Sequence, residues 1–513
     1  MKLTGFMTWA DDIMNPIAVK EMRQAVKGRS LGWVLMIFIA VQLTVVGGAV
    51  LLDESAAEDF DTGRNVFMVL QAILLGTCLL FLPIFTALRI SSERSDNNVD
   101  LLYITTLRPT QIIWGKFFTG LILTLLFFSA SMPFMTLTYL LRGLDMGAMF
   151  FTLGMSFVAV IVCIMVSILL ACPGGGLVGR GIRFLIGLGA LAAAFFMVVG
   201  ITRGFIDGYM YFGSFWDFWG PILTMLGITA LGTGLLFILS ATIITPPSAN
   251  KALGGRLYLL LIWLATGALV WLWYREIKEA EVFYVWGVMM AILFAASLLV
   301  ASCERFHLGP RVLRTIPRKK IFRLPTFLFY SGASRGSVFA AVMIGLTFLV
   351  VLMVPRSHGR GWDLNFYRDT VKLMSMVGLY TFAYTMTALF IRRIFFKDNH
   401  SPQLGLVIAV GLFVVLTVIP TLIGLMFKPE HRTSIDAMWY IANPLVMATY
   451  SGFWTRLAGS AINFSAIWSI IALVINMPWI FEDIKRFKPL RKVQAQEAVI
   501  GLTAENTGES DEV

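Results

Sequence analysis

Residue types that catalyse reactions occur in this 513-residue sequence, but not in the spacings of common catalytic motifs. The four histidines are isolated, and neither HExxH nor GxSxG occurs. The segment GGGLVGRG, 174–181, resembles a phosphate-binding loop, but Arg180 and Gly181 replace its Lys and Ser/Thr, so we expect a short glycine-rich turn. The serine-containing segment SGASRG, 331–336, has no base near it in sequence. The sequence therefore indicates a protein that is not an enzyme, with no catalytic residue, no metal and no directly bound cofactor.

The composition indicates the class of protein and the kind of elements in which these residues lie. Hydrophobic residues make up 58% of the chain and charged residues only 14%. Soluble domains carry about 25% charged residues. This shortage excludes a soluble multidomain enzyme, a disordered chain and a secreted disulfide scaffold, and it indicates a polytopic membrane protein.

Continuous apolar runs without period-2 alternation predict transmembrane helices and not a barrel, so the predicted fold class is all-α. About twelve segments are long enough to cross a bilayer: 31–52, 65–88, 117–141, 147–171, 184–202, 218–244, 257–274, 282–302, 337–355, 371–391, 404–427 and 458–480. The stretch 437–457 is also apolar and suits a partly inserted helix. The alternative count is therefore ten or eleven spans with a re-entrant segment.

The distribution of Lys and Arg predicts the orientation. With the N-terminus inside, the inner segments hold 29 of the 41 cations and the outer loops hold 11. By the positive-inside rule both termini are cytoplasmic, in the cell membrane or bacterial inner membrane. The net charge of +11 is therefore explained by inner loops and lipid, and we expect no nucleic-acid partner. The cytoplasmic tail covers 481–513; its end, 493–513, is acidic and poor in apolar residues, and we expect that end to be disordered.

An amphipathic helix is predicted before the first span, within residues 15–30. Asn15 suits the N-cap and Pro16 the first turn. Gly28 suits the helix end. This helix is either an interfacial element or a simple basic anchor. Its apolar positions are Met14, Ala18, Met22, Ala25 and Val26, and Lys20, Arg23, Gln24 and Lys27 lie on the other side.

The segment after the second span, 91–118, carries both signs of charge and an apolar cluster. A connector needs only to be short and basic. Mixed charge beside exposed apolar residues suits docking to a soluble partner, although a loop packed on itself explains the pattern equally well. Thr105 and Thr106 are suited to ending a short helix, and Pro109 to beginning the next.

These two segments carry a family resemblance over about residues 10–140. NPIAVKEMRQ, then a span pair, then the acid–Arg, Asp-Leu-Leu, Thr-Thr, Arg-Pro and Gly-Lys series resemble membrane subunits of ABC-2 type transporters. The resemblance implies an elbow helix with Asn15, Pro16, Lys20, Glu21 and Arg23. It also implies a separate ATP-binding subunit, which carries ATP and Mg²⁺ and docks on the 91–116 loop. The implied coupling residues are Glu93, Arg94, Asp100, Leu101, Leu102, Thr105, Arg108 and Pro109.

Members of this family have six spans per unit, whereas twelve are predicted here. The chain is either a fused pair of units, 31–244 and 245–480, or one unit with six extra spans; a second copy or further permease subunits are then needed. A fusion predicts a second coupling loop after the eighth span. The segment there, 302–336, has eight Lys or Arg and one acid. Its start echoes Ser92-Glu93-Arg94, but no second elbow helix precedes it. This basic loop suits the ATPase or, by default, anionic lipid.

Few polar residues interrupt the spans, which argues against a proton- or ion-coupled transporter and suits an energy source outside the membrane. Gln and Asn in spans are expected to tie helices together. The aromatic outer loop 203–220 is explained by an interfacial belt. In the resembled family this loop closes the outer exit, so the sharper hypothesis is an outer gate of Phe205, Tyr209, Tyr211, Phe215 and Trp216.

We therefore expect the permease subunit of an ATP-driven exporter. Two alternatives stay open. A membrane enzyme acting on lipid-linked substrates would need clustered ionisable groups, and the outer acids, such as Asp53 and Glu58, are better explained as a solvated loop. A scaffold that only recruits a partner has the same sequence features as the permease.

Overall fold

The structure is a computed structural model, and all of its regular elements in the described residues are helices. It describes residues 16–52, 60–95, 108–140, 145–174, 177–206, 218–246, 248–304, 308–353, 364–396, 404–427, 441–443 and 458–489. The chain divides into two compact units at Pro246–Pro247. The predicted boundary lies at 244–245, in the same connection.

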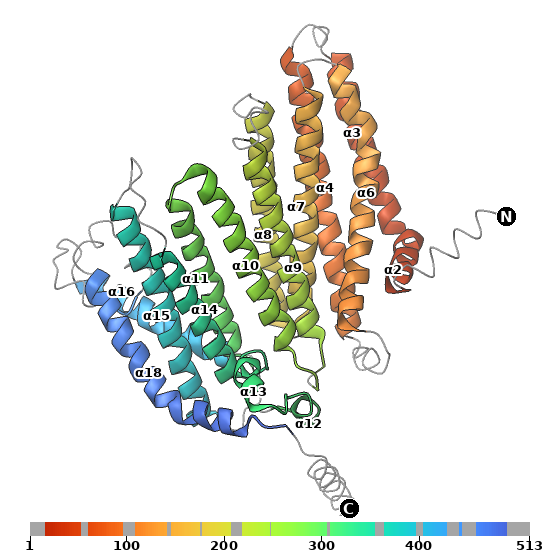
Figure 1. Cartoon of the computed structure of the whole chain (residues 1–513). Coiled ribbons are helices and arrows are strands. Elements are labelled where there is room, and N and C mark those ends of the chain that lie inside the picture. The colour runs from red at the N-terminus through yellow and green to blue at the C-terminus, as the bar shows by residue number, and fades with distance from the viewer. Residues whose placement is uncertain are drawn as a thin grey trace, which may run out of the picture. The chain divides into compact units, whose positions relative to one another are not determined.

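Unit 1 begins with a short helix and continues with long ones (Figure 1). Its helices are α2 (Pro16–Lys27), α3 (Arg29–Leu52), α4 (Phe60–Ser95), α6 (Pro109–Leu140), α7 (Met146–Ala171), α8 (Leu177–Ile206) and α9 (Gly220–Ile244). Those of unit 2 are α10 (Ala252–Ile277), α11 (Glu281–Ala301), α12 (Pro310–Leu313), α13 (Lys320–Phe327), α14 (Ala333–Met353), α15 (Leu364–Phe395), α16 (Leu404–Phe427) and α18 (Ala458–Arg486).

The protein is a polytopic all-α membrane protein, as the sequence predicts. Eleven helices in the described part are long and apolar enough to cross a bilayer. The eleventh predicted span, 404–427, forms α16, in which Leu404–Pro420 is a shorter apolar helix. All twelve predicted spans thus correspond to helices. Of the stretch 437–457, only 441–443 is described, and its carbonyl groups accept hydrogen bonds from Tyr380 and Tyr384 of α15.

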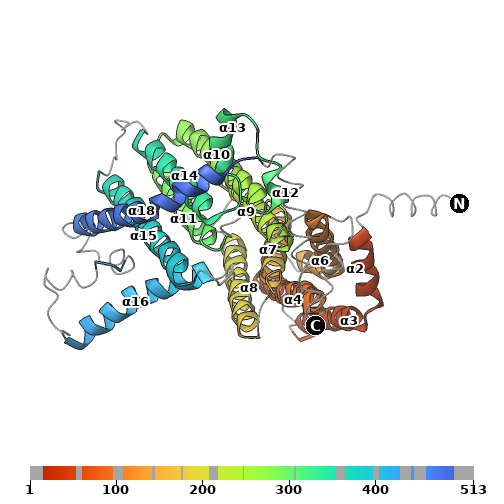
Figure 2. The same ribbon diagram turned by 90° about the horizontal axis from the view of Figure 1, so that it is seen from below.

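Helix α4 is the centre of unit 1, because it packs against α3, α6, α7 and α8. Its buried face is apolar over most of its length, from Phe67 to Leu82. Helix α2 lies at the edge of this unit against α3 and α6 (Figure 2). Unit 1 therefore has one long inner helix with the others around it, and the short N-terminal helix on its outside.

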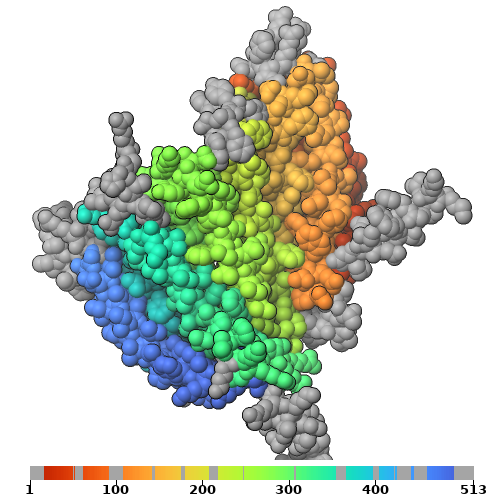
Figure 3. Space-filling model, viewed as in Figure 1, coloured from red at the N-terminus to blue at the C-terminus, as the bar shows by residue number. Residues whose placement is uncertain are grey.

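Unit 2 repeats the helix pairing of unit 1. When α10, α11, α14, α15, α16 and α18 are matched in order to α3, α4, α6, α7, α8 and α9, each main helix pair of unit 2 has a counterpart in unit 1. Helix α11 takes the place of α4 and packs against α10, α14 and α15. Figure 3 shows α18, in blue, along the flank of unit 2. The exception is α2, which has no counterpart in unit 2 among the described residues.

Two local expectations differ from the structure. The prediction of a glycine-rich turn over 174–181 was wrong for its second part, because α8 begins at Leu177 and includes Gly179 and Gly181. The second span continues as a helix to Ser95, well past the predicted end at 88. Of the apolar residues predicted on one side of α2, Ala18 and Ala25 are buried against unit 1 and Val26 is 71% exposed.

Candidate functional site

A buried carboxylate joins three helices of unit 1. Glu21 of α2 is only 3% exposed. Its Oε1 lies 2.8 Å from Nζ of Lys116 in α6, and its Oε2 lies 2.8 Å from Nη1 of Arg89 in α4. Each carboxylate oxygen therefore accepts a charge-assisted hydrogen bond from a different helix. We call these three residues the Glu21 node.

The node is closed by further contacts. Arg89 Nη1 also donates to the Glu21 backbone carbonyl at 3.0 Å, and its guanidinium lies 4.3 Å from the centre of the Phe85 ring. Burial of the Glu21 carboxyl group opposes its ionisation, but Lys116 and Arg89 outweigh burial and hold its pKa below the ordinary value. The node is therefore an ionised, geometrically fixed junction.

Close packing brings the three helices together. A Cβ atom on Gly115 of α6 would lie 2.9 Å from Cβ of Ile17 in α2, so only glycine allows this approach. Ala18 and Ala25 of α2 are each 1% exposed. Residues 18, 21 and 25 share one helix face, since they are three and four positions apart. Glu21 therefore lies in the middle of the buried face of α2.

The node lies beside the segment that the sequence predicts to dock a partner. Arg89 is in the last two turns of α4, and Lys116 is in the second turn of α6. Helix α6 begins at Pro109, and the Arg108 backbone N–H donates to Oε1 of Gln111 at 3.0 Å. This is the backward hydrogen bond of a capping box, with proline in the first helical position. Both ends of the connection between α4 and α6 are thus held in place.

The predicted coupling residues fall into three groups. Arg108 and Pro109 form the described start of α6. Glu93 and Arg94 lie in the last turn of α4 and not in a loop, and the structure describes only their backbone. The others, Asp100, Leu101, Leu102 and Thr105, lie outside the described residues.

The predicted elbow residues lie in α2, apart from Asn15, which is outside the described residues. Pro16 is the first residue of the helix. Lys20 and Arg23 are exposed, while Glu21 is buried in the node. The sequence predicted Lys20 and Arg23 on the polar side and gave Glu21 no partner, so it missed the burial of Glu21 and its pairing with Arg89 and Lys116. The spacing of Glu21 from Ala18 and Ala25 is the signal that could have shown this burial.

Of the predicted outer gate, only Phe205 is described. It is 6% exposed at the end of α8, and its ring centre lies 4.5 Å from that of Phe151 and 5.7 Å from that of Phe218. These three rings join the ends of α7, α8 and α9. The remaining gate residues, Tyr209, Tyr211, Phe215 and Trp216, lie outside the described residues.

Unit 2 has an ion pair at the corresponding place. Arg256, near the start of α10, donates from Nη2 to both carboxylate oxygens of Glu304 at 2.6 Å. Glu304 follows α11 and also accepts a hydrogen bond from the backbone N–H of Gly332, just before α14. Nη1 of Arg256 donates to the carbonyls of Leu328 and Tyr330 at 2.7 Å. The ends of α10, α11 and α14 are therefore fastened together.

The Glu21 node and the Arg256–Glu304 ion pair lie at corresponding helix ends of their units, but the acid and the cation have exchanged places. In unit 1 the acid lies on the element before the first span, and the cations lie on the second and third spans. In unit 2 the cation, Arg256, lies on the first span, and the acid follows the second. Three more arginines, Arg335, Arg392 and Arg393, bond to the same end of this unit, through Ser331, Ser302 and Ser334.

The connection between α11 and α14 carries a basic amphipathic helix, α13. Two of its apolar side chains are strongly exposed, Ile321 at 85% and Leu324 at 69%, whereas Phe327 is buried. Helices α12 and α13 lie at the end of unit 2 at which α11 ends and α14 begins (Figure 1). Apolar residues beside Arg318, Lys319 and Arg323 suit a membrane surface.

Two of the amide residues within the spans, Gln71 and Asn476, tie helices together, as the sequence predicts. Nε2 of Gln71 in α4 lies 2.7 Å from Ser156 Oγ in α7 and 3.0 Å from Thr202 Oγ1 in α8. Nδ2 of Asn476 in α18 donates to the Met386 carbonyl of α15 at 3.0 Å. Among the described residues, no group of three or more His, Cys, Asp or Glu is placed to hold a metal ion.

No protein-family model, curated protein or solved structure matches this chain.

Proposed function

We propose that this chain is the membrane-spanning permease subunit of an ATP-driven transporter of the ABC-2 type, working as an exporter. A separate soluble subunit binds ATP and Mg²⁺ and docks on the 91–116 segment. The sequence of this segment, with acids, arginines and an apolar cluster, is what supports a protein partner there. The integral membrane architecture supplies the body through which a substrate would pass.

The observation that carries the proposal is the Glu21 node. A force on the connection between α4 and α6 must reach the spans to do work. An unattached connector would absorb that force by bending. Here the two helix ends that flank the connector are bound to each other through one carboxylate, at 2.8 Å on each side. A displacement of the connector would therefore move α2, α4 and α6 together.

The matching helix pairs support a chain that supplies both halves of one pathway. Two six-helix units with the same pairing are expected if one unit was duplicated and fused. The lack of a counterpart of α2 among the described residues of unit 2, and the exchanged charges of its ion pair, then reflect divergence. Under this proposal the connection between α11 and α14, with α13, is the place for a second contact with the ATPase dimer or the lipid surface.

Coupling also has an energetic condition. The partner must bind the segment differently in its ATP-bound and ATP-free states, because equal binding to both shifts no equilibrium. The node sets how much of that difference reaches the spans. Docking and transmission are therefore separate properties, carried by the surface of the connector and by the buried Glu21, respectively.

The experiment tests them separately. The tagged full chain is purified in mild detergent, and a co-purifying protein with a GxxxxGK[ST] sequence is sought by mass spectrometry. The double variant Glu93→Lys, Arg94→Glu is expected to lose that partner. The control is Arg275→Glu, Glu276→Arg, an adjacent and exposed pair at the far end of α10. It is expected to retain the partner.

The variant Glu21→Gln then tests transmission. It leaves the connector surface unchanged, so the ATPase is expected to co-purify normally. The native complex is expected to hydrolyse ATP at a different rate after reconstitution of the chain in vesicles. The rate of the Glu21→Gln complex should not change on reconstitution. If no ATPase with this motif associates, or if the charge reversal at Glu93 and Arg94 has no effect, the proposed function is wrong.

A further inference from the structure

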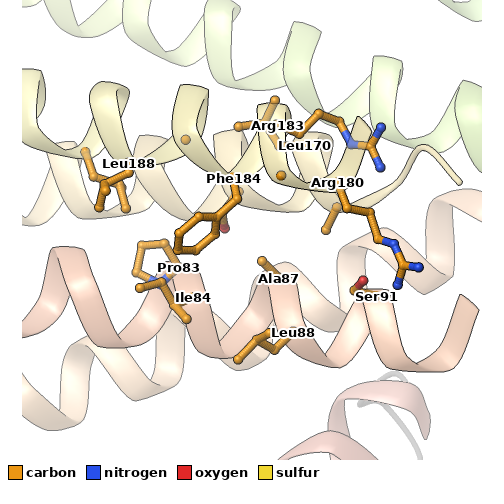
Figure 4. Close-up of a pocket in the computed structure, with 15 residues that line it drawn as sticks. Pro83, Ile84, Ala87, Leu88, Ser91, Leu170, Arg180, Arg183, Phe184 and Leu188 are labelled. Carbon is orange, nitrogen blue, oxygen red and sulfur yellow. The ribbon is translucent and has the colours of Figure 1, made fainter. Parts of the chain in front are cut away.

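A groove in unit 1 combines an apolar wall with two cations at one end. It lies between α4, α7 and α8 and has a volume of about 450 Å³. Figure 4 shows Leu188 at one end of the groove and Arg180 and Ser91 at the other. The side chains between them are apolar and include Pro83, Ile84, Ala87, Leu170 and Phe184.

The cations at the end of the groove are not neutralised within the described part of the chain. Arg180 is exposed and forms no ion pair or hydrogen bond with a described residue. Nη2 of Arg183 donates to the Pro173 carbonyl at 2.9 Å. This hydrogen bond holds the guanidinium in place but does not neutralise its positive charge. Two positive charges therefore stand next to an apolar channel at the end of the spans.

Two other grooves lined by described residues lack this combination. A groove of about 430 Å³ in unit 2, between α14, α15 and α18, has no charged residue in its lining. A groove of about 850 Å³ between α3 and α4 has none either. An acyl chain alone would suit all three. Of these three, the groove between α4, α7 and α8 is the one that offers apolar walls for an acyl chain and cations for an anion.

We propose that this groove binds one anionic phospholipid. Its phosphate would lie at Arg180 and Arg183, and one acyl chain would lie along Pro83, Phe184 and Leu188. The volume falls within the range of small-molecule sites, about 300–1,000 Å³. A basic site between membrane helices is suited to an anionic head group and not to a zwitterionic one. The site requires only a membrane around the chain and does not depend on the proposed function.

The lipid would contact α4 where a proline interrupts the hydrogen bonding of the helix. Pro83 cannot donate the backbone hydrogen bond to Leu79 that a regular helix has there, so α4 is weakened at the deep end of the groove. The groove ends at Ser91, two residues past Arg89 of the Glu21 node. A bound lipid would therefore pack against the stretch of α4 that leads from the proline to the node.

The test captures the lipid in place. The photo-crosslinking residue p-benzoylphenylalanine replaces Leu188, which is exposed, in the full-length protein. The protein is reconstituted in vesicles of phosphatidylcholine containing a minor fraction of phosphatidylglycerol, and the captured lipids are identified by mass spectrometry. Phosphatidylglycerol is expected to be enriched several-fold over its share in the vesicle. The same crosslinker at Phe348, in the uncharged groove of unit 2, is expected to show no enrichment.

The cation is tested by substitution. Arg180→Gln should lower the enrichment about fivefold, since one cation at a membrane surface contributes about 1 kcal/mol to binding an anionic lipid. Arg311→Gln removes an equally exposed cation in unit 2 and should leave it unchanged. Ala87→Phe fills the groove and should reduce capture of both lipids. Equal capture of the two lipids at Leu188, or enrichment that survives Arg180→Gln, would overturn the proposal.

Discussion

The Glu21 carboxylate and the Lys116 ammonium lie 2.8 Å apart, although 95 positions separate them in the chain. Both side chains are buried, at 4% and 6% exposure. This pair, extended by Arg89, fixes the N-terminal helix α2 to the start of α6 and the end of α4. Removing one member would leave the other charges buried without their partner, and that consequence can be measured.

Glu21→Ala is expected to destabilise the protein by about 3–5 kcal/mol, because the buried Lys116 and the partly buried Arg89 lose their counter-ion. Lys116→Met should also destabilise it. The double variant should be less destabilised than the sum of the two, since Lys116, which Glu21→Ala leaves without its counter-ion, is then absent as well and only Arg89 still lacks the carboxylate. Thermal unfolding in detergent measures all three.

The matched control for that cycle is Lys27→Ala, in the last turn of the same helix. Lys27 is exposed, so its removal should change stability by no more than about 0.5 kcal/mol. Additive effects of Glu21→Ala and Lys116→Met would show that the two side chains do not interact in the folded protein.

The node also predicts a pH dependence. The pKa of Glu21 is lowered by its two cations, against the effect of burial, so the fold favours the ionised form. The stability that this gives is fully present above the ordinary pKa of 4.5 and is lost as the pH falls through the lower pKa of the folded state. The difference in unfolding temperature between the native protein and Glu21→Gln should therefore be constant from pH 7 to 5 and narrow below pH 4.5. Narrowing between pH 7 and 5 would mean a raised pKa instead.

The sequence was sufficient for the helices but not for the contacts between them. Hydropathy located all twelve membrane-spanning helices, since a helix must be apolar over the length that crosses the bilayer. It placed the end of α4 at 88 because Arg89 and Ser91 are polar, yet a helix continues beyond the hydrocarbon and reaches Ser95. Hydropathy marks where the lipid ends and not where the helix ends.

The candidate site shows the same limit. The spacing of Ala18, Glu21 and Ala25 is sufficient to predict the burial of Glu21, because these residues share a helix face. Nothing local connects Glu21 to Arg89 or Lys116, which lie 68 and 95 positions away. Their pairing depends on how α2 packs on α6, and this packing is set by Gly115.

A buried amide in α3 predicts a stabilising substitution. Gln42 is fully buried, and neither its Oε1 nor its Nε2 has a hydrogen-bond partner in the described part of the chain. Gln42→Leu removes unsatisfied polar atoms and should raise the stability by about 1–3 kcal/mol. Gln71→Leu is the matched opposite, because Gln71 bonds to α7 and α8, and its loss should lower the unfolding temperature. A lower unfolding temperature for Gln42→Leu would indicate that the amide binds a group not yet identified.

The packing of α16 on the end of α11 depends on one glycine. A Cβ atom on Gly405 would lie 2.1 Å from the Ser302 carbonyl oxygen, which is backbone and also accepts a hydrogen bond from Arg392 at 2.7 Å. The side chain of Gly405→Ala therefore cannot be accommodated by rotating a neighbour, and α16 must move away from α11. We expect a loss of several degrees in unfolding temperature and faster proteolysis next to α16 in detergent. Gly411→Ala, two turns further along the same helix, meets nothing within 4 Å and should be neutral or slightly stabilising, because alanine is the better helix former. Equal effects of the two substitutions would show that α16 is not seated on Ser302.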